Sequence, residues 1–278
     1  MLGSIHPLQA KTSPTVFVSI LPQQYFVQQI AKDKLNIQVM VKPGESPATY
    51  EPSPLQMKAL SKAKGYFSIG VPFEFKWLPK ISALYPHLNI IHTDKGIQKM
   101  PIHQHSHEKK IHDASHFIPD PHIWLSPPLV KVQILNILLF LKKLEPDHQQ
   151  FFESNYHEFL SSISQLDKEL NKMLTPLKHK SFMVFHPSWG YFAQAYGLKQ
   201  IPIEIEGKDV KPWHLKELIL KAKKNRIRVI FAQPQFSSKS ASLIAREIGG
   251  QVLFIDPLAL DWEHNLKNVG LKVQKNLK

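Results

Sequence analysis

The apolar residues in the N-terminal third of the chain form short runs that alternate with segments of helical spacing. The short runs are rich in β-branched and aromatic residues, which favour strands. Strands are expected at Thr15–Leu21, Asn36–Val41, Gly65–Ile69 and Asn89–His92, and helices at Gln23–Ala31, Pro54–Ala63 and Phe73–Leu84. Strands that alternate with helices at this spacing predict βα units around a parallel sheet.

A second series of the same kind occupies the C-terminal third. Strands are expected at Phe182–Phe185, Gln200–Ile205, Val229–Ala232 and Gln251–Ile255, and helices at Ser188–Tyr196, Pro212–Lys224 and Ser238–Ile248. Between the two series lie an apolar helix, Leu129–Leu144, and the longest periodic segment of the chain, Asp147 to about Leu177. A helix of about 28 residues is roughly 42 Å long, enough to cross the whole molecule.

These patterns predict an α/β fold with two βα lobes, each around a parallel-type central sheet, joined by one long spanning helix. We place an N-terminal tail at 1–14, the first lobe at 15–146, the spanning helix at 147–178 and the second lobe at 179–278. A length of 278 residues agrees with two domains of ordinary size. The tryptophans Trp124, Trp189, Trp213 and Trp262 are expected to pack in the core or between the lobes.

Composition narrows the function classes. The net charge of +13 comes largely from lysines scattered along the chain, without an arginine-rich cluster, so a nucleic-acid partner is not expected. The absence of cysteine excludes disulfides, thiolate metal sites and cysteine nucleophiles. No apolar run approaches the length of about 18–20 residues that spans a bilayer, so membrane insertion is not expected either. Residues 1–14 are interpreted as a possible remnant of a signal peptide.

Candidate metal ligands follow two of the predicted strands. His186 comes directly after Phe182–Phe185, and Asp256 comes directly after Gln251–Ile255. His122 follows two prolines in the sequence Pro-Asp-Pro-His, between the His-rich segment and a predicted helix. Ligands in open α/β sheets bind beyond the carboxyl ends of the strands. Two imidazoles and a carboxylate suit Zn²⁺, and also Mn²⁺ or Fe²⁺.

Longer motifs sharpen this hypothesis. The stretches DPHIWLSP (Asp120–Pro127) and VFHPSWGYFAQAYGL (Val184–Leu198), in this order, resemble those of the zinc and manganese substrate-binding proteins of ABC transporters, the ZnuA-like cluster A-I family. The resemblance runs from about residue 15 to residue 270. It implies two lobes joined by a long helix, with the metal at the lobe interface and His122, His186 and Asp256 as its ligands.

The resemblance also implies a biological setting. The chain would be a monomeric periplasmic protein that binds zinc tightly and delivers it to an ABC permease in the inner membrane, without catalytic turnover. Zn²⁺ is then the transported ligand, and Mn²⁺ or Fe²⁺ are alternatives. A His-rich segment at 103–116, with five histidines, is typical of zinc-specific members and is interpreted as a loop that gathers zinc; the alternative is a solvated polar loop.

One position departs from the family pattern. The family usually has a histidine ligand in its first loop, but this chain has Ala48 there, in the context SPATYEP. Three explanations remain open. The fourth coordination position of the metal is open or filled by water. Alternatively, another residue binds the metal in place of the missing histidine, or the site is degenerate and binds something else. The candidates for substitution are Glu45, Tyr50, Glu204, Glu206 and a histidine of the 103–116 loop.

Two other functions remain as alternatives. Three protein ligands with an open position is the arrangement of catalytic zinc, so a zinc-dependent hydrolase is conceivable, although the sequence contains no HExxH motif. An adhesin-like surface protein is the second alternative, because relatives of this fold carry that label; without a lipobox cysteine, lipid anchoring has no support.

Overall fold

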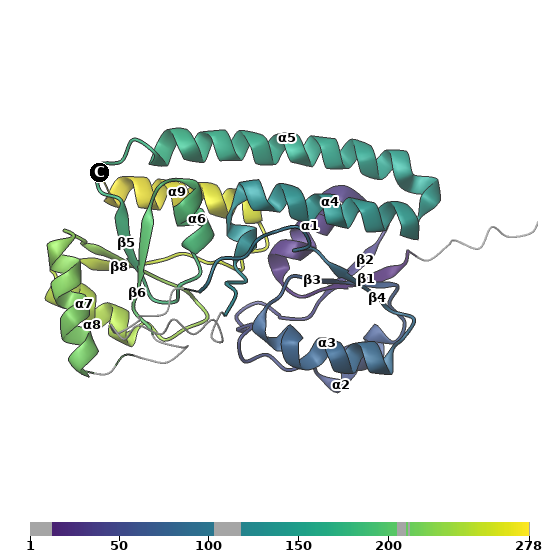
Figure 1. Cartoon of the computed structure of the whole chain (residues 1–278), viewed down its shortest axis with the longest axis horizontal. Coiled ribbons are helices and arrows are strands. Elements are labelled where there is room, and N and C mark those ends of the chain that lie inside the picture. Colours follow the sequence, from purple (N-terminus) through teal and green to yellow (C-terminus); the bar gives the residue numbers. More distant parts are fainter. Residues whose placement is uncertain (1–12, 103–117, 205–209, 211, 278) are drawn as a thin grey trace, which may run out of the picture.

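Two α/β lobes lie side by side, and one long helix runs across both (Figure 1). The computed structural model describes residues 13–102, 118–204, 210 and 212–277. The expected fold class, two parallel-sheet lobes joined by a spanning helix, is confirmed. In the described part of the chain, no helix combines the length and the apolar character needed to cross a membrane.

The N-terminal lobe is built on a four-stranded parallel sheet with the strand order β2-β1-β3-β4. The central strand β1 buries Val16, Phe17 and Val18 completely, as expected for a parallel strand that is covered on both faces. The strands are β1 Thr15–Val18, β2 Asn36–Val39, β3 Gly65–Ser68 and β4 Asn89–His92, and the helices are α1 Leu21–Ala31, α2 Pro54–Leu60, α3 Pro72–Leu84 and α4 Pro127–Leu144.

Proline begins each of these four helices or stands at its second residue. The position suits proline because the first backbone N–H groups of a helix have no intrahelical acceptor. Helix α2 adds a capping box, in which Ser53 accepts from the backbone N–H of Gln56 and the Gln56 side chain accepts from that of Ser53. Local sequence therefore fixes where the helices of this lobe start.

The C-terminal lobe repeats the architecture with the strand order β6-β5-β7-β8, again all parallel. Helices α7 and α8 cover one face of this sheet over a separate apolar core that contains Met183, Ile203, Leu218 and Ile244. The strands are β5 Ser181–Val184, β6 Lys199–Pro202, β7 Val229–Ala232 and β8 Gln251–Phe254, and the helices are α6 Gly190–Ala195, α7 Pro212–Lys224, α8 Lys239–Glu247 and α9 Trp262–Asn276.

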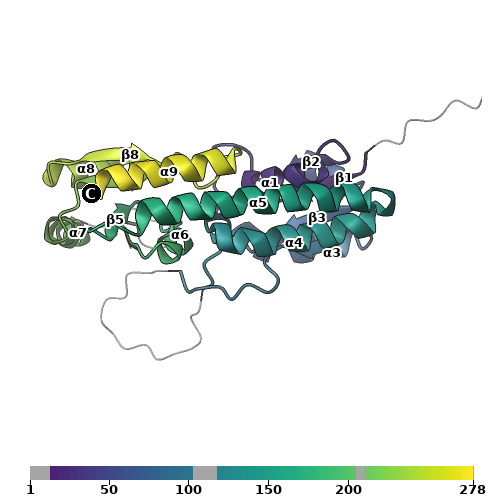
Figure 2. The same ribbon diagram turned by 90° about the horizontal axis from the view of Figure 1, so that it is seen from above.

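The spanning helix α5 covers Gln149–Leu174 and follows a single 3-10 turn, η3, at Pro146–His148. Its buried side chains repeat at helical spacing: Phe152, Phe159, Ile163, Leu166, Leu170 and Leu174. Helix α5 packs on α1 and α4 of the first lobe and on α9 of the second (Figure 2). Helix α9 was not among the elements expected from the sequence, and it gives the second lobe its contact with α5.

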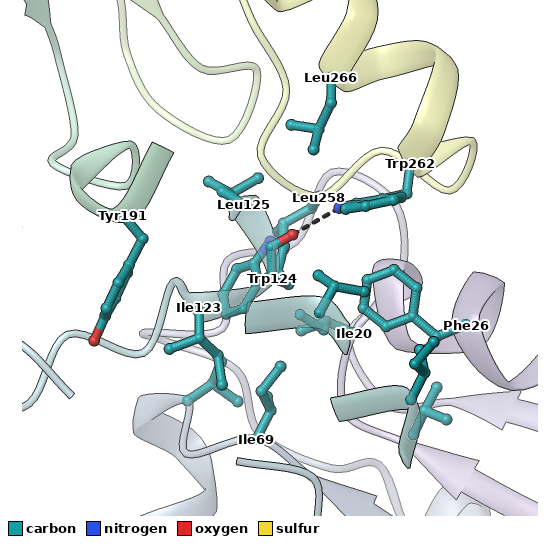
Figure 3. Packing of buried hydrophobic residues seen from close by; sticks show 14 of the residues in the cluster. Ile20, Phe26, Ile69, Ile123, Trp124, Leu125, Tyr191, Leu258, Trp262 and Leu266 are labelled. Carbon is teal, nitrogen blue, oxygen red and sulfur yellow. Dashed lines mark hydrogen bonds between the residues drawn. The ribbon is translucent and has the colours of Figure 1, made fainter. Parts of the chain in front are cut away.

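Two tryptophans join the lobes at their interface (Figure 3). The indole N–H of Trp262, on α9, donates to the carbonyl of Trp124 at 2.6 Å, and the indole N–H of Trp124 donates to the carbonyl of Pro257 at 2.7 Å. Trp124 lies in the short 3-10 helix η2, Ile123–Leu125. The prediction that Trp124, Trp189 and Trp262 are packed inside is confirmed, but it is wrong for Trp213, whose side chain is 52% exposed on α7.

Candidate metal centre

Four polar side chains of the second lobe follow the carboxyl ends of its four strands. His186 comes after β5, Glu204 after β6, Gln235 after β7 and Asp256 after β8. Because the sheet order is β6-β5-β7-β8, Glu204 lies beside His186 and Gln235 lies beside Asp256. The hydrogen bonds within the site follow these two neighbour relations.

His186 is fixed through both its ring and its backbone. Its Nδ1 donates to Glu204 Oε1 at 2.5 Å, which leaves Nε2 as the ring nitrogen with a free lone pair. Gln233 accepts from the backbone N–H of His186 at 3.1 Å and donates to its carbonyl at 2.8 Å. The ring of Phe236 stacks on the imidazole at a centroid distance of 4.7 Å. These contacts hold the imidazole in one orientation.

Burial also prepares the protonation state of His186. Loss of hydration lowers the pKa of this imidazole from its usual 6.5, and the hydrogen bond to Glu204 opposes but does not cancel that effect. A lowered pKa keeps the ring neutral at pH 7. A neutral imidazole is the form that binds a transition metal, so no proton has to leave before the metal arrives.

His122 is held in the same manner from the first lobe. Its Nδ1 and its backbone N–H both contact Asp120 Oδ1, at 2.6 Å and 2.9 Å. Asp120 is 1% exposed, and its carbonyl accepts from the hydroxyl of Tyr191, on α6 of the other lobe, at 3.0 Å. Both histidines therefore have a carboxylate behind them, which is the usual second-sphere arrangement of metal-binding imidazoles.

The two imidazoles face one another across the lobe interface. Their ring centroids are 5.2 Å apart, and the ring planes are inclined by 70°. Two imidazoles that bind one tetrahedral zinc through ring nitrogens, with Zn–N of about 2.0–2.1 Å, would have their centroids roughly 5 Å apart. The separation of His122 and His186 thus suits a single shared metal ion.

A cavity of about 230 Å³ adjoins this pair. Its wall includes His122, His186 and Gln235, and the rest is mostly apolar, with Val71, Phe75, Ile118, Trp124, Phe236 and Leu258 among the lining residues. Ala48 also lines the cavity, so the loop position where the family resemblance implies a histidine does face the proposed site. A methyl group offers no lone pair to a metal.

Asp256 lies outside this cavity. It lines a neighbouring one of about 220 Å³, and its Oδ1 accepts from Gln235 Nε2 at 2.8 Å and from the backbone N–H of Leu258 at 2.9 Å. The structure thus brings His122 and His186 together but not Asp256. Within the described ranges, no three histidine, aspartate or glutamate side chains are grouped to hold a metal. Direct ligation by Asp256 stays a prediction.

The residues considered as substitutes for the missing histidine have different environments. Glu45 Oε2 accepts from the backbone N–H of Lys42 in an exposed turn, and the Tyr50 hydroxyl donates to Gln56. Neither residue lines the cavity. Glu204 accepts the hydrogen bond from Nδ1 of His186. Glu206 and the 103–116 loop lie outside the described residues.

Sequence reasoning missed two residues of the site, Asp120 and Gln235. Asp120 begins the DPHIWLSP motif, but only its contact with His122 shows what its side chain does. Gln235 follows β7 just as His186 and Asp256 follow their strands, so the strand-end criterion could have found it.

Comparison with known proteins identifies the family. Residues 16–267 match the family model for ZnuA, described as the periplasmic zinc-uptake complex component A. The chain is 30% identical to the high-affinity zinc uptake system protein ZnuA of Bacillus subtilis strain 168, over 92% of this chain and 82% of that protein. A crystal structure of ZnuA superposes with a TM-score of 0.89 at 42% identity, covering 96% of this chain and all of that one. A deletion mutant of ZnuA with zinc bound gives 0.88 at 42% identity, covering 96% and 98%. The chain therefore belongs to the ZnuA family.

Proposed function

We propose that this protein binds Zn²⁺ between its lobes and delivers it to an ABC permease. The observation that carries the proposal is the pair His122 and His186, contributed by opposite lobes and each backed by a buried carboxylate. Asp256 is the third member of the proposed site, and the position facing Ala48 is open or filled by water. The relatives named for zinc uptake, one of them with zinc bound, support this assignment.

The preference for zinc over manganese or iron follows from the donor atoms. Two neutral imidazole nitrogens suit Zn²⁺ better than the harder Mn²⁺, which prefers oxygen ligands. The rest of the cavity wall around the imidazoles is mostly apolar, so few other polar groups are available to bind the ion. Mn²⁺ and Fe²⁺ remain the alternatives to be tested, because a site with only two nitrogen donors discriminates less than one with three.

The setting of this function is likewise proposed. Family membership supports a periplasmic protein that works with an inner-membrane permease, and we expect the protein to act as a monomer. Loading would take place between two lobes that α5 connects, since this helix packs on helices of both lobes. The metal would then be released toward the permease by a change at the lobe interface.

The function of a zinc-dependent hydrolase fits the geometry of this site less well. A hydrolase needs a general base within reach of the metal-bound water. The two carboxylates nearest the imidazoles, Asp120 and Glu204, each accept the Nδ1 proton of a histidine. The relatives described above are also named as uptake components and not for catalysis. The protein is a metal-binding transport component and not an enzyme.

The test is calorimetric titration of the metal-free protein with Zn²⁺, Mn²⁺ and Fe²⁺. We expect one tight site that prefers Zn²⁺, and we expect His122→Ala or His186→Ala to weaken zinc binding at least 100-fold, since removal of an outer-sphere partner alone costs about 10- to 100-fold. His264→Ala is the matched control, because His264 is exposed on α9. Equal affinities in all three variants and the parent protein would refute the proposal.

A further inference from the structure

The amide of Gln235 lies between the two neighbouring cavities of the lobe interface. It lines both the cavity that contains His122 and His186 and the one that contains Asp256. Its Nε2 donates to Asp256 Oδ1 at 2.8 Å. Its Oε1 is buried and has no hydrogen-bond partner among the described residues. A buried acceptor without a donor is unfavourable, so this oxygen calls for an explanation.

The orientation of this amide follows from its partner. An ionised carboxylate can only accept hydrogen bonds, so the amide group that faces Asp256 must be the NH₂. The oxygen therefore occupies the other branch of the planar amide. Since Gln235 also forms part of the wall next to the two imidazoles, its oxygen is the polar atom that this residue can offer to the metal cavity.

Three side chains of the cavity wall are held by the same kind of hydrogen bond. His122 Nδ1 is bonded to Asp120, His186 Nδ1 to Glu204, and Gln235 Nε2 to Asp256. In each case a carboxylate binds one nitrogen of a side chain that lines the cavity, and the remaining ring nitrogen or amide oxygen forms no hydrogen bond with any residue that the structure describes. Such backing fixes the orientation of a ligand and increases its basicity.

From this repetition we infer that Gln235 Oε1 is the third protein ligand of the metal and that Asp256 backs it instead of binding the ion itself. The inference rests on the proposed function, because it concerns the same metal. It assigns to Asp256 the role that Asp120 and Glu204 have for the histidines. The three carboxylates then offset the charge of the divalent ion from the second sphere.

An amide oxygen in this position has a consequence for metal choice. Carbonyl oxygens are harder donors than imidazole and suit Mn²⁺ comparatively well. A site of two imidazoles and one amide oxygen should therefore prefer Zn²⁺ over Mn²⁺ by a smaller factor than a site with a third imidazole. Gln235→His replaces the oxygen by a nitrogen donor, and we expect it to raise the ratio of Zn²⁺ to Mn²⁺ affinity; an unchanged or lower ratio would count against the assignment.

The decisive comparison uses two substitutions in the full-length, metal-free protein titrated with Zn²⁺. Gln235→Leu removes the amide at similar volume, and we expect at least a 10-fold loss of affinity. Asp256→Asn keeps an oxygen that can accept from Gln235 but removes the charge, and we expect a smaller loss. Gln251→Leu, at an exposed position of β8 in the same lobe, is the matched control and should bind zinc like the parent protein.

Direct ligation by Asp256 predicts the opposite order. Asp256→Asn would then cause the larger loss, and Gln235→Leu would leave affinity unchanged or tighten it by releasing the carboxylate; that order would overturn the inference. If the parent protein itself bound no zinc, the proposed function would fail, which is a different result. A crystal structure of the zinc-loaded parent protein avoids any folding defect of the variants. Zinc bonded to Gln235 Oε1 supports the inference, and zinc bonded to Asp256 refutes it.

Discussion

Trp262→Phe tests how the lobes are held together. Trp262 is 1% exposed, and its ring lies 5.1 Å from that of Phe26 on α1 and 6.5 Å from that of Phe159 on α5, measured between centroids. Its N–H donates across the interface to the carbonyl of Trp124 (Figure 3). The phenyl ring retains most of the aromatic contacts but removes this donor.

The expected cost has two parts. A buried carbonyl that loses its donor costs about 1–3 kcal/mol. The phenylalanine side chain is smaller by roughly 40 Å³, and at about 24 cal/mol per Å³ an unfilled cavity of that size adds about 1 kcal/mol. The free energy of unfolding should therefore fall by about 2–4 kcal/mol, because the tightly packed surroundings from three helices limit how far the site can collapse.

Urea denaturation followed by circular dichroism measures this change. Trp213→Phe is the matched control, since the same substitution at a side chain that is 52% exposed should alter the free energy of unfolding by about 0.5 kcal/mol or less. If Trp262→Phe cost no more than Trp213→Phe, the hydrogen bond between the lobes would not contribute to stability, and the reasoning would be wrong.

Two further predictions concern buried positions away from the metal. Burial raises the pKa of Glu74 from 4.5 to about 7. The protonated group therefore contributes about 3 kcal/mol to the free energy of unfolding below pH 4.5, and this contribution is lost as the pH rises to 7. Urea titrations between pH 4 and 8 should therefore show a flatter pH dependence for Glu74→Gln than for the parent protein, and parallel curves would contradict this. At Gly270 of α9, an added Cβ would lie 2.5 Å from Leu170 Cδ2 on α5, so Gly270→Ala should lower stability by about 1–3 kcal/mol in a thermal or urea melt. An increase, as expected from helix propensity alone, would show that the Leu170 side chain moves aside at little cost.

The local pattern of the chain was sufficient for most of its elements. Helix α7 and strand β7 have the bounds that the apolar pattern predicts, because the apolar spacing and the flanking polar residues mark their ends clearly. Helix α9 was missed although it has a buried stripe, Trp262, Leu266, Val269 and Val273.

The sequence by itself predicted the fold class and the long connecting helix, because apolar periodicity is a local feature, and it offered two candidate histidines that the structure brings together. It also predicted that Ala48 stands where the family resemblance implies a histidine ligand. Only the tertiary structure decided the partners of each group. The strand order β6-β5-β7-β8 sets Glu204 beside His186 and Gln235 beside Asp256, and residues separated by 18 or 21 positions in the chain meet for that reason. Spacing along one chain does not reveal which strands are neighbours in a sheet. The sequence could therefore offer Asp256 as a candidate ligand, but it could not show that Asp256 accepts from the Gln235 amide.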